Sequence, residues 1–250
     1  MRVLGVIPAR LGSTRLPNKP LQHLAGEPLI TRVVQRVLEH GLTDQLVVAT
    51  DSSRIARVAE QAGVMAVLTD GGHQTGTDRV AEVAARPEFS GFDAVVNIQG
   101  DEPFLSREAL AGALGRVEQG DDVGTAAAPL EPHLAGDPSR VKVVTDARGR
   151  ALYFSRSVIP HQRDSGGRPM MELYWQHIGI YAFSRAALTR WIGLAPGAAE
   201  QAERLEQLRA LHHGMTIGVA LLREPALPGV DTADDLRRAE AHWYTFQGQV

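Results

Sequence analysis

The chain has 250 residues, of which 44% are hydrophobic and 22% charged, which is the composition of an ordinary globular protein. Its 26 basic and 29 acidic side chains give a formal net charge of −3, which argues against a nucleic-acid-binding protein held by a global basic field but leaves room for a local basic site. The absence of cysteine excludes disulfides, thiolate zinc sites, iron–sulfur clusters and cysteine nucleophiles.

The first half of the chain alternates short apolar runs with amphipathic segments. The apolar runs predict strands at residues 3–7, 46–49, 64–68, 94–98 and 123–127, and the amphipathic segments predict helices at 28–40, 52–62, 78–85 and 106–117. Because the runs are continuously apolar, they indicate an α/β fold with a mostly parallel, Rossmann-type sheet covered on both faces. Sheets of this kind bind their ligands at the carboxyl ends of the strands.

The pattern changes after Pro129. The polar segment at 161–169, with two glycines and a proline, predicts a mobile loop. The remaining expected elements are a hairpin of 140–146 and 150–155 around Ala147, Arg148 and Gly149, strands at 173–183 and 216–221, and helices at 200–212 and 234–243. We therefore expect one domain over residues 1–250, with an antiparallel insertion near 130–185.

Neither a secretion signal nor a membrane span is expected. Residues 1–8 are too short for a signal peptide and end in a proline. No run of about 18 apolar residues follows, which is the length that a spanning helix requires.

The segment PARLGSTRLPNKP, residues 8–20, directly follows the first predicted strand and precedes a helix. It contains Gly12 and the three cations Arg10, Arg15 and Lys19. Backbone N–H groups and fixed positive charge are what a polyphosphate binds, with arginine as a fork and lysine as a point charge. The loop matches neither the Walker A pattern nor the G-x-G-x-x-G pattern. We interpret it as a phosphate site rather than a solvated basic loop.

Asp101 follows the fourth predicted strand, within the sequence NIQGDEP of residues 97–103. A carboxylate at a strand's carboxyl end, beside the glycine Gly100 that lets a ligand approach, is a common place for a magnesium ligand. Magnesium keeps substrate phosphates and waters, so one or two aspartates suffice. The alternative is a turn that caps the following helix, and these residues alone leave both interpretations open.

Asp231 lies in PGVDTADD, residues 228–235. An aspartate or threonine before a helix with acidic residues in its first turn is an ordinary helix N-terminus. Taken alone, the segment therefore favours a capping role for Asp231, unless a second member of a site lies elsewhere in the chain.

Other polar segments also leave alternatives open. Residues 70–79, DGGHQTGTDR, could hold a base or a ribose, or form a flexible loop with Thr77 or Asp78 as the helix cap. His177 lies on a predicted strand, where a lone histidine is more often structural than functional. Arg156 could pair with an anionic substrate or with an interface carboxylate. The simplest interpretation of the predicted helix with Glu203, Glu206, Gln207 and Arg209 is a solvated face with i,i+3 pairs.

Nine segments resemble, in order and over nearly the whole chain, the 3-deoxy-manno-octulosonate (Kdo) cytidylyltransferases, also called CMP-Kdo synthetases. They are IPARLGSTRLPNKPL (7–21), VVATD (47–51), HQTGTDRVAE (73–82), NIQGDEPF (97–104), VKVVTD (141–146), ALYFSRSVIP (151–160), HIGIY (177–181), LEQLRAL (205–211) and GVDTADDL (229–236). Each segment alone is modest evidence, but nine in register are highly specific. The sequence departs from the family pattern at 161–172, 198–201 and 243–250.

The resemblance implies a nucleotide-diphospho-sugar transferase-like α/β fold and a single nucleotidyltransferase domain. It implies Mg²⁺-dependent transfer of CMP from CTP to the anomeric hydroxyl of Kdo, with release of pyrophosphate. It further implies a cytoplasmic homodimer that serves lipopolysaccharide biosynthesis, with its dimerisation subregion near 130–185. Neither nucleic acid nor a membrane is an expected partner.

Carried over by position, the resemblance assigns a role to each candidate residue. Asp101 and Asp231 become the metal ligands, which reverses the capping preference for Asp231, and Lys19, Arg10 and Asp101 become the catalytic residues. The nucleotide site comprises Ala9, Arg10, Gly12, Ser13, Arg15, Lys19, Thr75, Gly76, Arg79 and Gly100. The sugar site comprises Gln99, Arg156, His177, Tyr181, Glu206 and Gln207.

Nucleotidyl transfer builds negative charge on the α-phosphate and the leaving pyrophosphate, so positioning and electrostatic stabilisation supply most of the acceleration. One alternative is a cytidylyltransferase for sialic acid or 8-amino-Kdo, which would differ around residues 156–181. Another is an enzyme that uses UTP or GTP and a sugar phosphate, which needs a second phosphate-binding cluster that we do not find. A non-catalytic nucleotide-binding regulator is the third, and the joint presence of Lys19, Asp101 and Asp231 counts against it.

Overall fold

In the computed structural model, which describes residues 1–163 and 173–247, the chain forms two units. Unit 1 contains residues 1–107 and 227–250, and unit 2 contains residues 108–226. Both ends of the chain thus belong to unit 1. The single domain expected over residues 1–250 stays a prediction.

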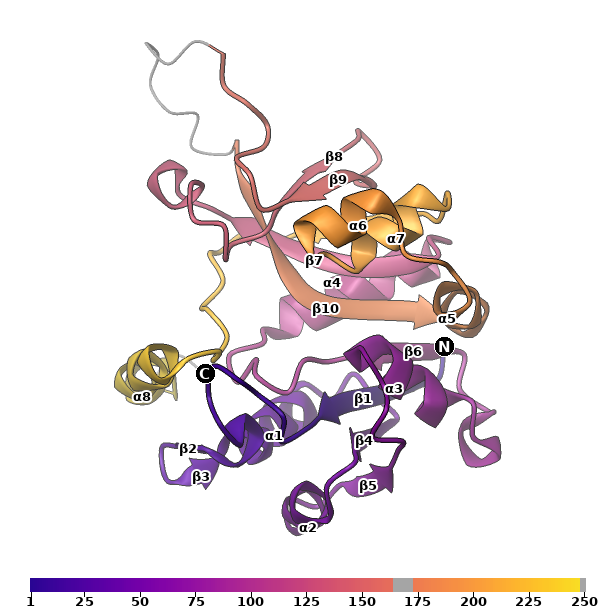
Figure 1. Ribbon diagram of the computed structural model, residues 1–250, viewed down its shortest axis with the longest axis vertical. Coiled ribbons are helices and arrows are strands. Elements are labelled where there is room, and N and C mark those ends of the chain that lie inside the picture. Colours follow the sequence, from indigo (N-terminus) through magenta and orange to yellow (C-terminus); the bar gives the residue numbers. More distant parts are fainter. Residues whose placement is uncertain (164–172, 248–250) are drawn as a thin grey trace. The chain divides into compact units, whose positions relative to one another are not determined.

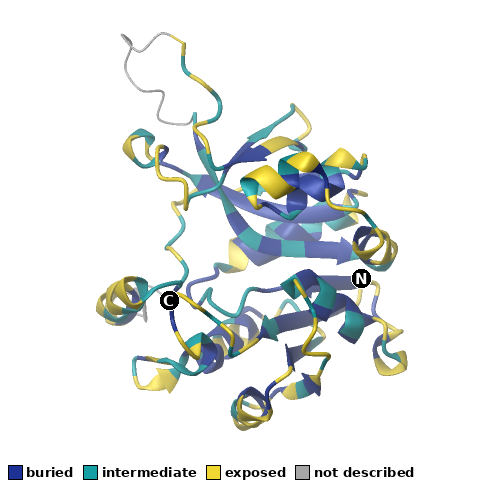
Figure 2. Cartoon of the chain, viewed as in Figure 1, coloured by how far each residue is buried: buried dark blue, intermediate teal, exposed yellow. Residues whose placement is uncertain are grey.

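Unit 1 is built on four parallel strands, β1 (Val3–Ala9), β4 (Gln45–Thr50), β5 (Met65–Leu68) and β6 (Ala94–Asn97) (Figure 1). β1 pairs with β6 on one side and with β4 on the other, and β4 pairs with β5. Val6, Ile7, Val47 and Val48 are fully buried, and Figure 2 shows β1 in the dark blue of buried residues. Burial on both faces explains why these strands are continuously apolar.

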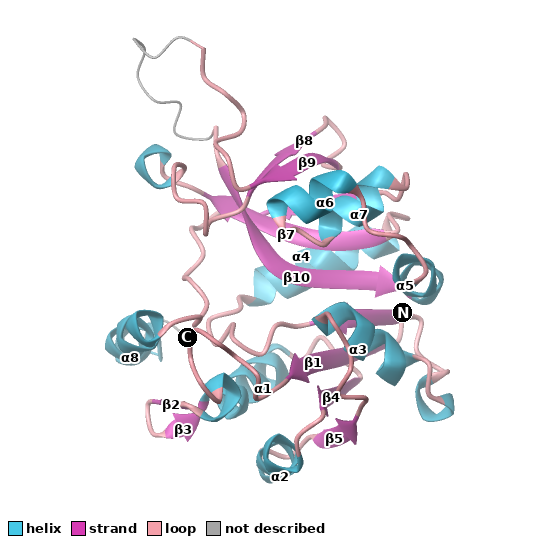
Figure 3. Cartoon of the chain, viewed as in Figure 1, coloured by secondary structure: helices cyan, strands magenta, loops and turns pink. Residues whose placement is uncertain are grey.

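The helices of unit 1 follow the expected alternation with its strands (Figure 3). They are α1 (Leu29–His40), α2 (Ser53–Gln61), α3 (Gly76–Ala84) and the C-terminal α8 (Ala233–Gln247). α3 packs against β1, β4 and β6, and α2 packs against β4 and β5. The small elements are the hairpin of β2 (His23–Leu24) and β3 (Glu27–Pro28) and the 3-10 helices η1 (Lys19–Leu21) and η2 (Pro87–Phe89).

The start of α3 differs from the expectation that Thr77 or Asp78 is its cap. Thr75 is the N-cap: its hydroxyl accepts a hydrogen bond from the Asp78 N–H at 3.1 Å, and the Asp78 carboxylate accepts one from the Thr75 N–H at 3.1 Å. This reciprocal capping box satisfies two N–H groups that the helix itself leaves unpaired. It fixes Thr75 and Gly76 at the end of the loop that follows β5.

Helix α8 packs on the first part of the chain within unit 1. The ring of Trp243 lies 5.7 Å from the Phe104 ring, between centroids, and the Arg32 guanidinium lies 4.8 Å from the Trp243 ring centroid. Glu240 accepts a hydrogen bond from the Ala25 N–H at 2.7 Å. The buried cluster beneath the helix consists of Leu16, Leu24, Leu29, Phe104, Val230, Ala239 and Trp243. These contacts fix the segment before α8 to the segment that carries Lys19.

Unit 2 is built around an antiparallel pair, β7 (Val123–Pro129) and β10 (Trp175–Ser184). β11 (Ile217–Leu221) pairs in parallel with β7, and the hairpin of β8 (Lys142–Thr145) and β9 (Ala151–Ser155) joins β10 through β8. The expected hairpin and the expected antiparallel strands are therefore confirmed. The mobile loop predicted at 161–169 lies outside the described residues from 164 onward.

The helices of unit 2 are α4 (Arg107–Glu118), whose first residue belongs to unit 1, α5 (Arg185–Ile192), α6 (Ala198–Glu203) and α7 (Gln207–His212), with the 3-10 helix η3 (Pro132–Leu134). α4 passes so close to β7 that a Cβ on Gly124 would lie 1.8 Å from the Ala113 carbonyl oxygen. Only glycine permits this packing. α5, which packs against β10, is absent from the sequence-based expectations.

The single helix predicted over 200–212 is wrong, because the chain breaks into α6 and α7 at Arg204, which has a left-handed φ of 54°. Arg156 donates hydrogen bonds to the carbonyl oxygens of Glu203 at 2.7 Å and Arg204 at 3.4 Å, and a continuous helix would need these carbonyls internally. The buried Glu200 and Arg209 side chains then join the two helices through bonds of 2.6 and 2.9 Å. A solvated face is therefore wrong for Arg209 and also for Gln207, which is 3% exposed.

Candidate active site

A pocket of about 360 Å³ lies in unit 1, a volume typical of small-molecule sites. The loops after β1, β5 and β6 and the segment before α8 form it, and these strand ends meet because the strands are parallel. The pocket contains every residue expected to bind the nucleotide, both expected metal ligands and Gln99. Its lining is Pro8, Ala9, Arg10, Gly12, Ser13, Thr14, Arg15, Lys19, Pro20, His73, Thr75, Gly76, Arg79, Gln99, Gly100, Asp101 and Asp231.

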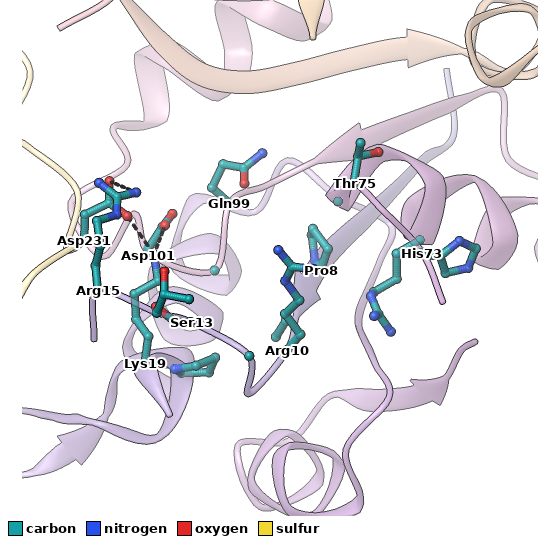
Figure 4. A pocket seen from close by; sticks show the side chains of 17 residues that line it. Pro8, Arg10, Ser13, Arg15, Lys19, His73, Thr75, Gln99, Asp101 and Asp231 are labelled. Atoms are coloured by element: carbon teal, nitrogen blue, oxygen red, sulfur yellow. Dashed lines mark hydrogen bonds and ion pairs between the residues drawn. The ribbon is translucent and has the colours of Figure 1, made fainter. Parts of the chain in front are cut away.

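The charged groups of this pocket are unevenly distributed (Figure 4). Arg15, Lys19, Asp101 and Asp231 gather at one end, which we call the carboxylate end. His73 lies at the opposite end, which we call the histidine end, close to Thr75. The side chain of Arg10 lies between the two ends.

Lys19 connects the two aspartates of the carboxylate end. Its ammonium donates to Asp231 Oδ1 at 2.9 Å and to Asp101 Oδ2, and Arg15 lies 3.2 Å from Asp231 Oδ2. The Lys19 side chain is 17% exposed. Burial alone would lower the pKa of Lys19, but Asp101 and Asp231 outweigh it and raise that pKa above its ordinary value. The lysine is therefore a fixed positive charge at neutral pH.

Asp231 is free for this contact because other residues cap α8. The Asp235 carboxylate accepts hydrogen bonds from the N–H groups of Asp231 at 3.2 Å and Thr232 at 2.8 Å, and the Thr232 hydroxyl accepts one from the Asp235 N–H at 3.1 Å. The interpretation of Asp231 as the cap is thus wrong. The Val230 N–H donates to the Asp101 carbonyl oxygen at 2.8 Å, which holds the segments of the two aspartates side by side.

Glu102 is an acidic neighbour that the sequence pattern did not single out. A Cβ on Gly229 would lie 2.9 Å from Glu102 Oε1, so glycine is what lets the segment before α8 pass this carboxyl group. Burial and, after it, the charges of Asp101 and Asp231 raise the pKa of Glu102 to about 8, against the opposing effect of Lys19. Because a group with that pKa is largely protonated at pH 7, the carboxylate end carries two negative charges rather than three.

Arg79 forms part of the pocket wall, and its side chain is only 3% exposed. It donates to Asp51 Oδ2 at 3.1 Å and to the Thr69 hydroxyl. Asp51 was not among the predicted site residues, although its position directly after β4 is the signal that could have identified it.

The remaining sugar-site candidates lie in unit 2. His177 and Tyr181 are neighbours on β10, with ring centroids 5.4 Å apart, and His177 Nε2 lies 2.9 Å from the Thr125 hydroxyl. That hydroxyl also lies within hydrogen-bond distance of the carbonyl oxygens of Ile178, at 3.2 Å, and Ile180, at 2.7 Å. Burial lowers the pKa of His177 to about 3 and raises the pKa of Tyr181, so both side chains are neutral at pH 7.

Arg156, Glu206 and Gln207 meet around the turn between α6 and α7. The Arg156 guanidinium donates to the carbonyl oxygens of Pro138 at 2.9 Å, Glu203 and Arg204, so it holds the backbone of this turn. Glu206 accepts a hydrogen bond from the Trp191 indole at 3.4 Å, and Gln207 is buried. The sugar-binding roles of these three residues stay predictions.

The two aspartates of the carboxylate end fit a magnesium ion. Both carboxylates already converge on one cation, the Lys19 ammonium, and one or two carboxylates are what magnesium takes from a protein. Within residues 1–163 and 173–247, no group of three or more His, Asp or Glu side chains forms a candidate metal site. Substrate oxygens and waters would therefore have to complete the coordination shell.

Comparison with known proteins agrees with this geometry. Residues 4–217 match the family described as cytidylyltransferase. The 3-deoxy-manno-octulosonate cytidylyltransferase of Gemmatimonas aurantiaca is 51% identical over 245 residues, which are 97% of this chain and 95% of the relative. The enzyme of that name from Methylococcus capsulatus is 50% identical over 246 residues, which are 95% of each chain.

Among solved structures, the CMP:2-keto-3-deoxy-manno-octonic acid synthetase complexed with CTP matches with a TM-score of 0.90 and 36% identity, over 98% of this chain and 99% of the other. The fold and the site thus define an α/β nucleotidyltransferase, and the expected fold class is confirmed. The chain belongs to the family of 3-deoxy-manno-octulosonate cytidylyltransferases. None of the described helices is both long and apolar enough to cross a membrane.

Proposed function

We propose that this enzyme transfers CMP from CTP to the anomeric hydroxyl of Kdo and releases pyrophosphate. The observation that carries the proposal is the pocket of unit 1, which gathers the cations Arg10, Arg15 and Lys19 with the carboxylates Asp101 and Asp231. The names of relatives about half identical to this chain support the choice of both substrates. The matching solved structure is a complex with CTP, which supports CTP as the donor.

In this proposal Arg10, Arg15 and Lys19 bind the triphosphate, together with the backbone N–H group of Gly12. Negative charge grows on the α-phosphate and on the leaving pyrophosphate during transfer. Fixed cations stabilise that charge most when their positions need no rearrangement. Lys19 meets this condition because two carboxylates hold its ammonium, and its partial burial strengthens its field relative to water.

Asp101 and Asp231 would hold Mg²⁺, which when bound supplies a Lewis acid that neutralises charge on the reacting phosphate. The backbone hydrogen bond between Val230 and Asp101 holds the segments that carry the two carboxylates side by side. No side chain acts as a nucleophile, because the sugar hydroxyl attacks the phosphorus directly.

Gln99, Arg156, His177, Tyr181, Glu206 and Gln207 are proposed to bind the hydroxyls and the carboxylate of the sugar acid. Neutral His177 and Tyr181 offer polar atoms without charge, which suits sugar hydroxyls. We place the reaction in the cytoplasm, as a step of lipopolysaccharide biosynthesis.

We further propose a homodimer that forms through the segment near 130–185. In support, the side chains of Leu152, Tyr153 and Val158 in that segment are 62%, 37% and 40% exposed. Apolar and aromatic side chains are common constituents of protein interfaces. Sedimentation velocity of the purified chain tests the assembly, and a monomer at micromolar concentration would contradict it.

The reaction itself is tested by measuring pyrophosphate release from CTP with Mg²⁺, with and without Kdo. We expect release that depends on Kdo and yields CMP-Kdo in equal amount. Replacing Kdo by sialic acid or 8-amino-Kdo, and CTP by UTP, should reduce the rate strongly. A faster rate with either other sugar acid would reassign the substrate, and release without any sugar acid would exclude the proposed transfer.

A further inference from the structure

The loop between β5 and α3, residues 69–75, borders the histidine end of the pocket. Its two ends are fixed: the Thr69 N–H donates to the Thr50 carbonyl oxygen at 2.9 Å, and Thr75 belongs to the capping box of α3. Between them, Gly72 bonds to the Asp70 carboxylate at 2.6 Å and Gln74 bonds to the Gly72 carbonyl oxygen at 3.0 Å. These last two bonds lie within the loop and do not attach it to the sheet.

Glu82 on α3 supplies that attachment. Its Oε2 accepts a hydrogen bond from the Asp70 N–H at 2.9 Å and lies 2.6 Å from His73 Nε2. In the described part of unit 1, the hydrogen bonds that tie residues 70–74 to the rest of the unit both run to this one oxygen. Because α3 packs against β1, β4 and β6, Glu82 connects the loop to the sheet of unit 1.

Arg86 completes the network and, like Glu82, is not among the residues that line the pocket. Its guanidinium donates to Glu82 Oε1 at 3.1 Å and to the Leu68 carbonyl oxygen at the end of β5. Burial alone would raise the pKa of Glu82, but His73, the Asp70 N–H and Arg86 lower it to about 2. Glu82 is therefore ionised at neutral pH, and a charged acceptor makes stronger hydrogen bonds than a neutral one.

His73 is the member of the network that reaches the pocket, whereas Glu82 does not line it. If the triphosphate binds at the carboxylate end, as proposed above, the nucleoside extends toward His73 and Thr75 (Figure 4). We infer that Glu82 is a positioning residue for the nucleoside of CTP, which acts by holding His73 and the loop of residues 69–75 against the pocket. This inference rests on the proposed function.

A purely structural role is the competing explanation, because a Glu–Arg pair four residues apart at a helix end is a common stabilising pair. The two roles differ in what they affect. A structural role changes thermal stability and leaves CTP affinity intact. A positioning role changes CTP affinity, and acts through His73.

The test measures CTP binding by isothermal titration calorimetry without Kdo, and steady-state kinetics with each substrate varied. Glu82→Ala should raise the Kd and the KM for CTP at least fivefold, with kcat and the KM for Kdo within twofold of wild type. His73→Ala should give a similar increase. The double variant with both substitutions should bind CTP no more weakly than the single variant that has the higher Kd. Glu60→Ala, an exposed glutamate of α2 in the same unit, is the matched control and should change nothing.

Two further variants separate the parts of the network. Glu82→Gln keeps an acceptor oxygen for Asp70 and His73 but loses the ion pair with Arg86, so it should restore most of the CTP affinity. Arg86→Ala removes the same ion pair and leaves the loop attached, so it should also bind CTP nearly as the wild type does. Large losses in both variants would place the effect in the ion pair and overturn the inference.

The inference and the proposed function fail separately. If wild type neither binds CTP nor releases pyrophosphate with Kdo, the proposed function is wrong. If wild type is active and Glu82→Ala binds CTP within twofold of it, the inference is wrong and the function stands. If Glu82→Ala does not fold, as judged by circular dichroism, His73→Ala decides: unchanged CTP affinity overturns the inference, and a fivefold loss supports it.

Discussion

Lys19 is held by two carboxylates from distant parts of the chain, Asp101 after β6 and Asp231 before α8. We expect Asp101→Asn and Asp231→Asn each to abolish synthesis without unfolding the protein, because each removes one anionic ligand from the proposed magnesium site. The loss corresponds to several kcal/mol of transition-state stabilisation, on the order of a thousandfold or more in rate.

The measurement is turnover at millimolar Mg²⁺ beside Mn²⁺ binding by electron paramagnetic resonance in the presence of CTP, with melting curves as the folding control. Glu27→Gln, an exposed glutamate of the same unit, is the matched control. Near-wild-type turnover in either aspartate variant would remove that residue from the metal role.

His177 makes the stability of the protein dependent on pH. The unfolded chain binds a proton at this imidazole near pH 6.5, whereas burial lowers the pKa in the folded protein to about 3. Between these values the unfolded state binds more protons, so the free energy of unfolding falls as the pH is lowered from about 6.5 to about 3, by at most about 1.4 kcal/mol per pH unit. Above pH 6.5 the contribution no longer changes.

Urea unfolding of wild type and His177→Gln at pH values from 4 to 8 checks this expectation. The variant should show a flatter dependence below pH 6.5, because it lacks the group that the unfolded state protonates. Tyr181, the titratable neighbour of His177, is neutral throughout this range and does not interfere. Exposed His212→Gln should follow wild type, and parallel curves for wild type and His177→Gln would contradict the assignment.

At the scale of elements, helix α8 holds Asp231 in place. Its buried Trp243 packs on Phe104 and lies against Arg32, so truncation to alanine removes this docking and costs about 3–5 kcal/mol of stability. We expect Trp243→Ala to melt earlier and, in the surviving folded fraction, to need a higher Mg²⁺ concentration for half-maximal activity.

Trp243→Phe should keep most of both properties, because an aromatic ring still fills the site. Tyr244→Ala is the control on the same helix, since Tyr244 is 71% exposed. A folded Trp243→Ala variant with an unchanged Mg²⁺ requirement would mean that α8 stabilises the unit without positioning Asp231.

The elements of unit 1 were predictable because their signals are local. Continuous apolar runs identify buried parallel strands, and helices α1 and α2 begin and end within two residues of expectation. The break between α6 and α7 was not predictable, because the Arg156 side chain that binds its carbonyl oxygens lies 47 residues before Glu203 in the chain. The role of Asp231 was similarly hidden, since the local pattern fits a cap equally well and only the folded chain shows that Thr232 and Asp235 provide it.

The pocket itself was partly predictable from the sequence. Cations and a carboxylate directly after strands β1 and β6 identify a strand-end site, which is why Arg10, Lys19 and Asp101 could be proposed together. The pair of Glu82 and His73 could not be predicted from the sequence. Their contact joins a helix to the loop before it, and no spacing rule identifies such a pair.

At the scale of the whole molecule, a slightly acidic chain carries a pocket whose lining has more cations than carboxylates. The net charge of −3 therefore says little about the site, because local charge and not the sum decides what binds. The cations and carboxylates of the pocket come from residues 8–19, 79, 101 and 231, all within unit 1. Five of the six sugar-site candidates belong to unit 2.

This distribution predicts that substitutions in the two units affect different substrates. Arg10→Ala in unit 1 should raise the KM for CTP at least tenfold and change the KM for Kdo little. His177→Ala and Gln207→Ala in unit 2 should do the reverse, because a buried polar group left without its substrate partner discriminates strongly. Steady-state kinetics with each substrate varied at saturating levels of the other is the measurement.

The same unit 2 variants must also be examined by sedimentation velocity, because these residues would have another use if they built a subunit interface. A variant that dissociates while its Kdo kinetics stay intact assigns the residue to the interface. An equal rise in the KM for CTP and in the KM for Kdo would contradict the assignment of the two substrates to different units. We expect a selective rise in the KM for Kdo, with the assembly and the KM for CTP unchanged. His177 is neutral and Gln207 is buried, so neither side chain offers a charge to a triphosphate.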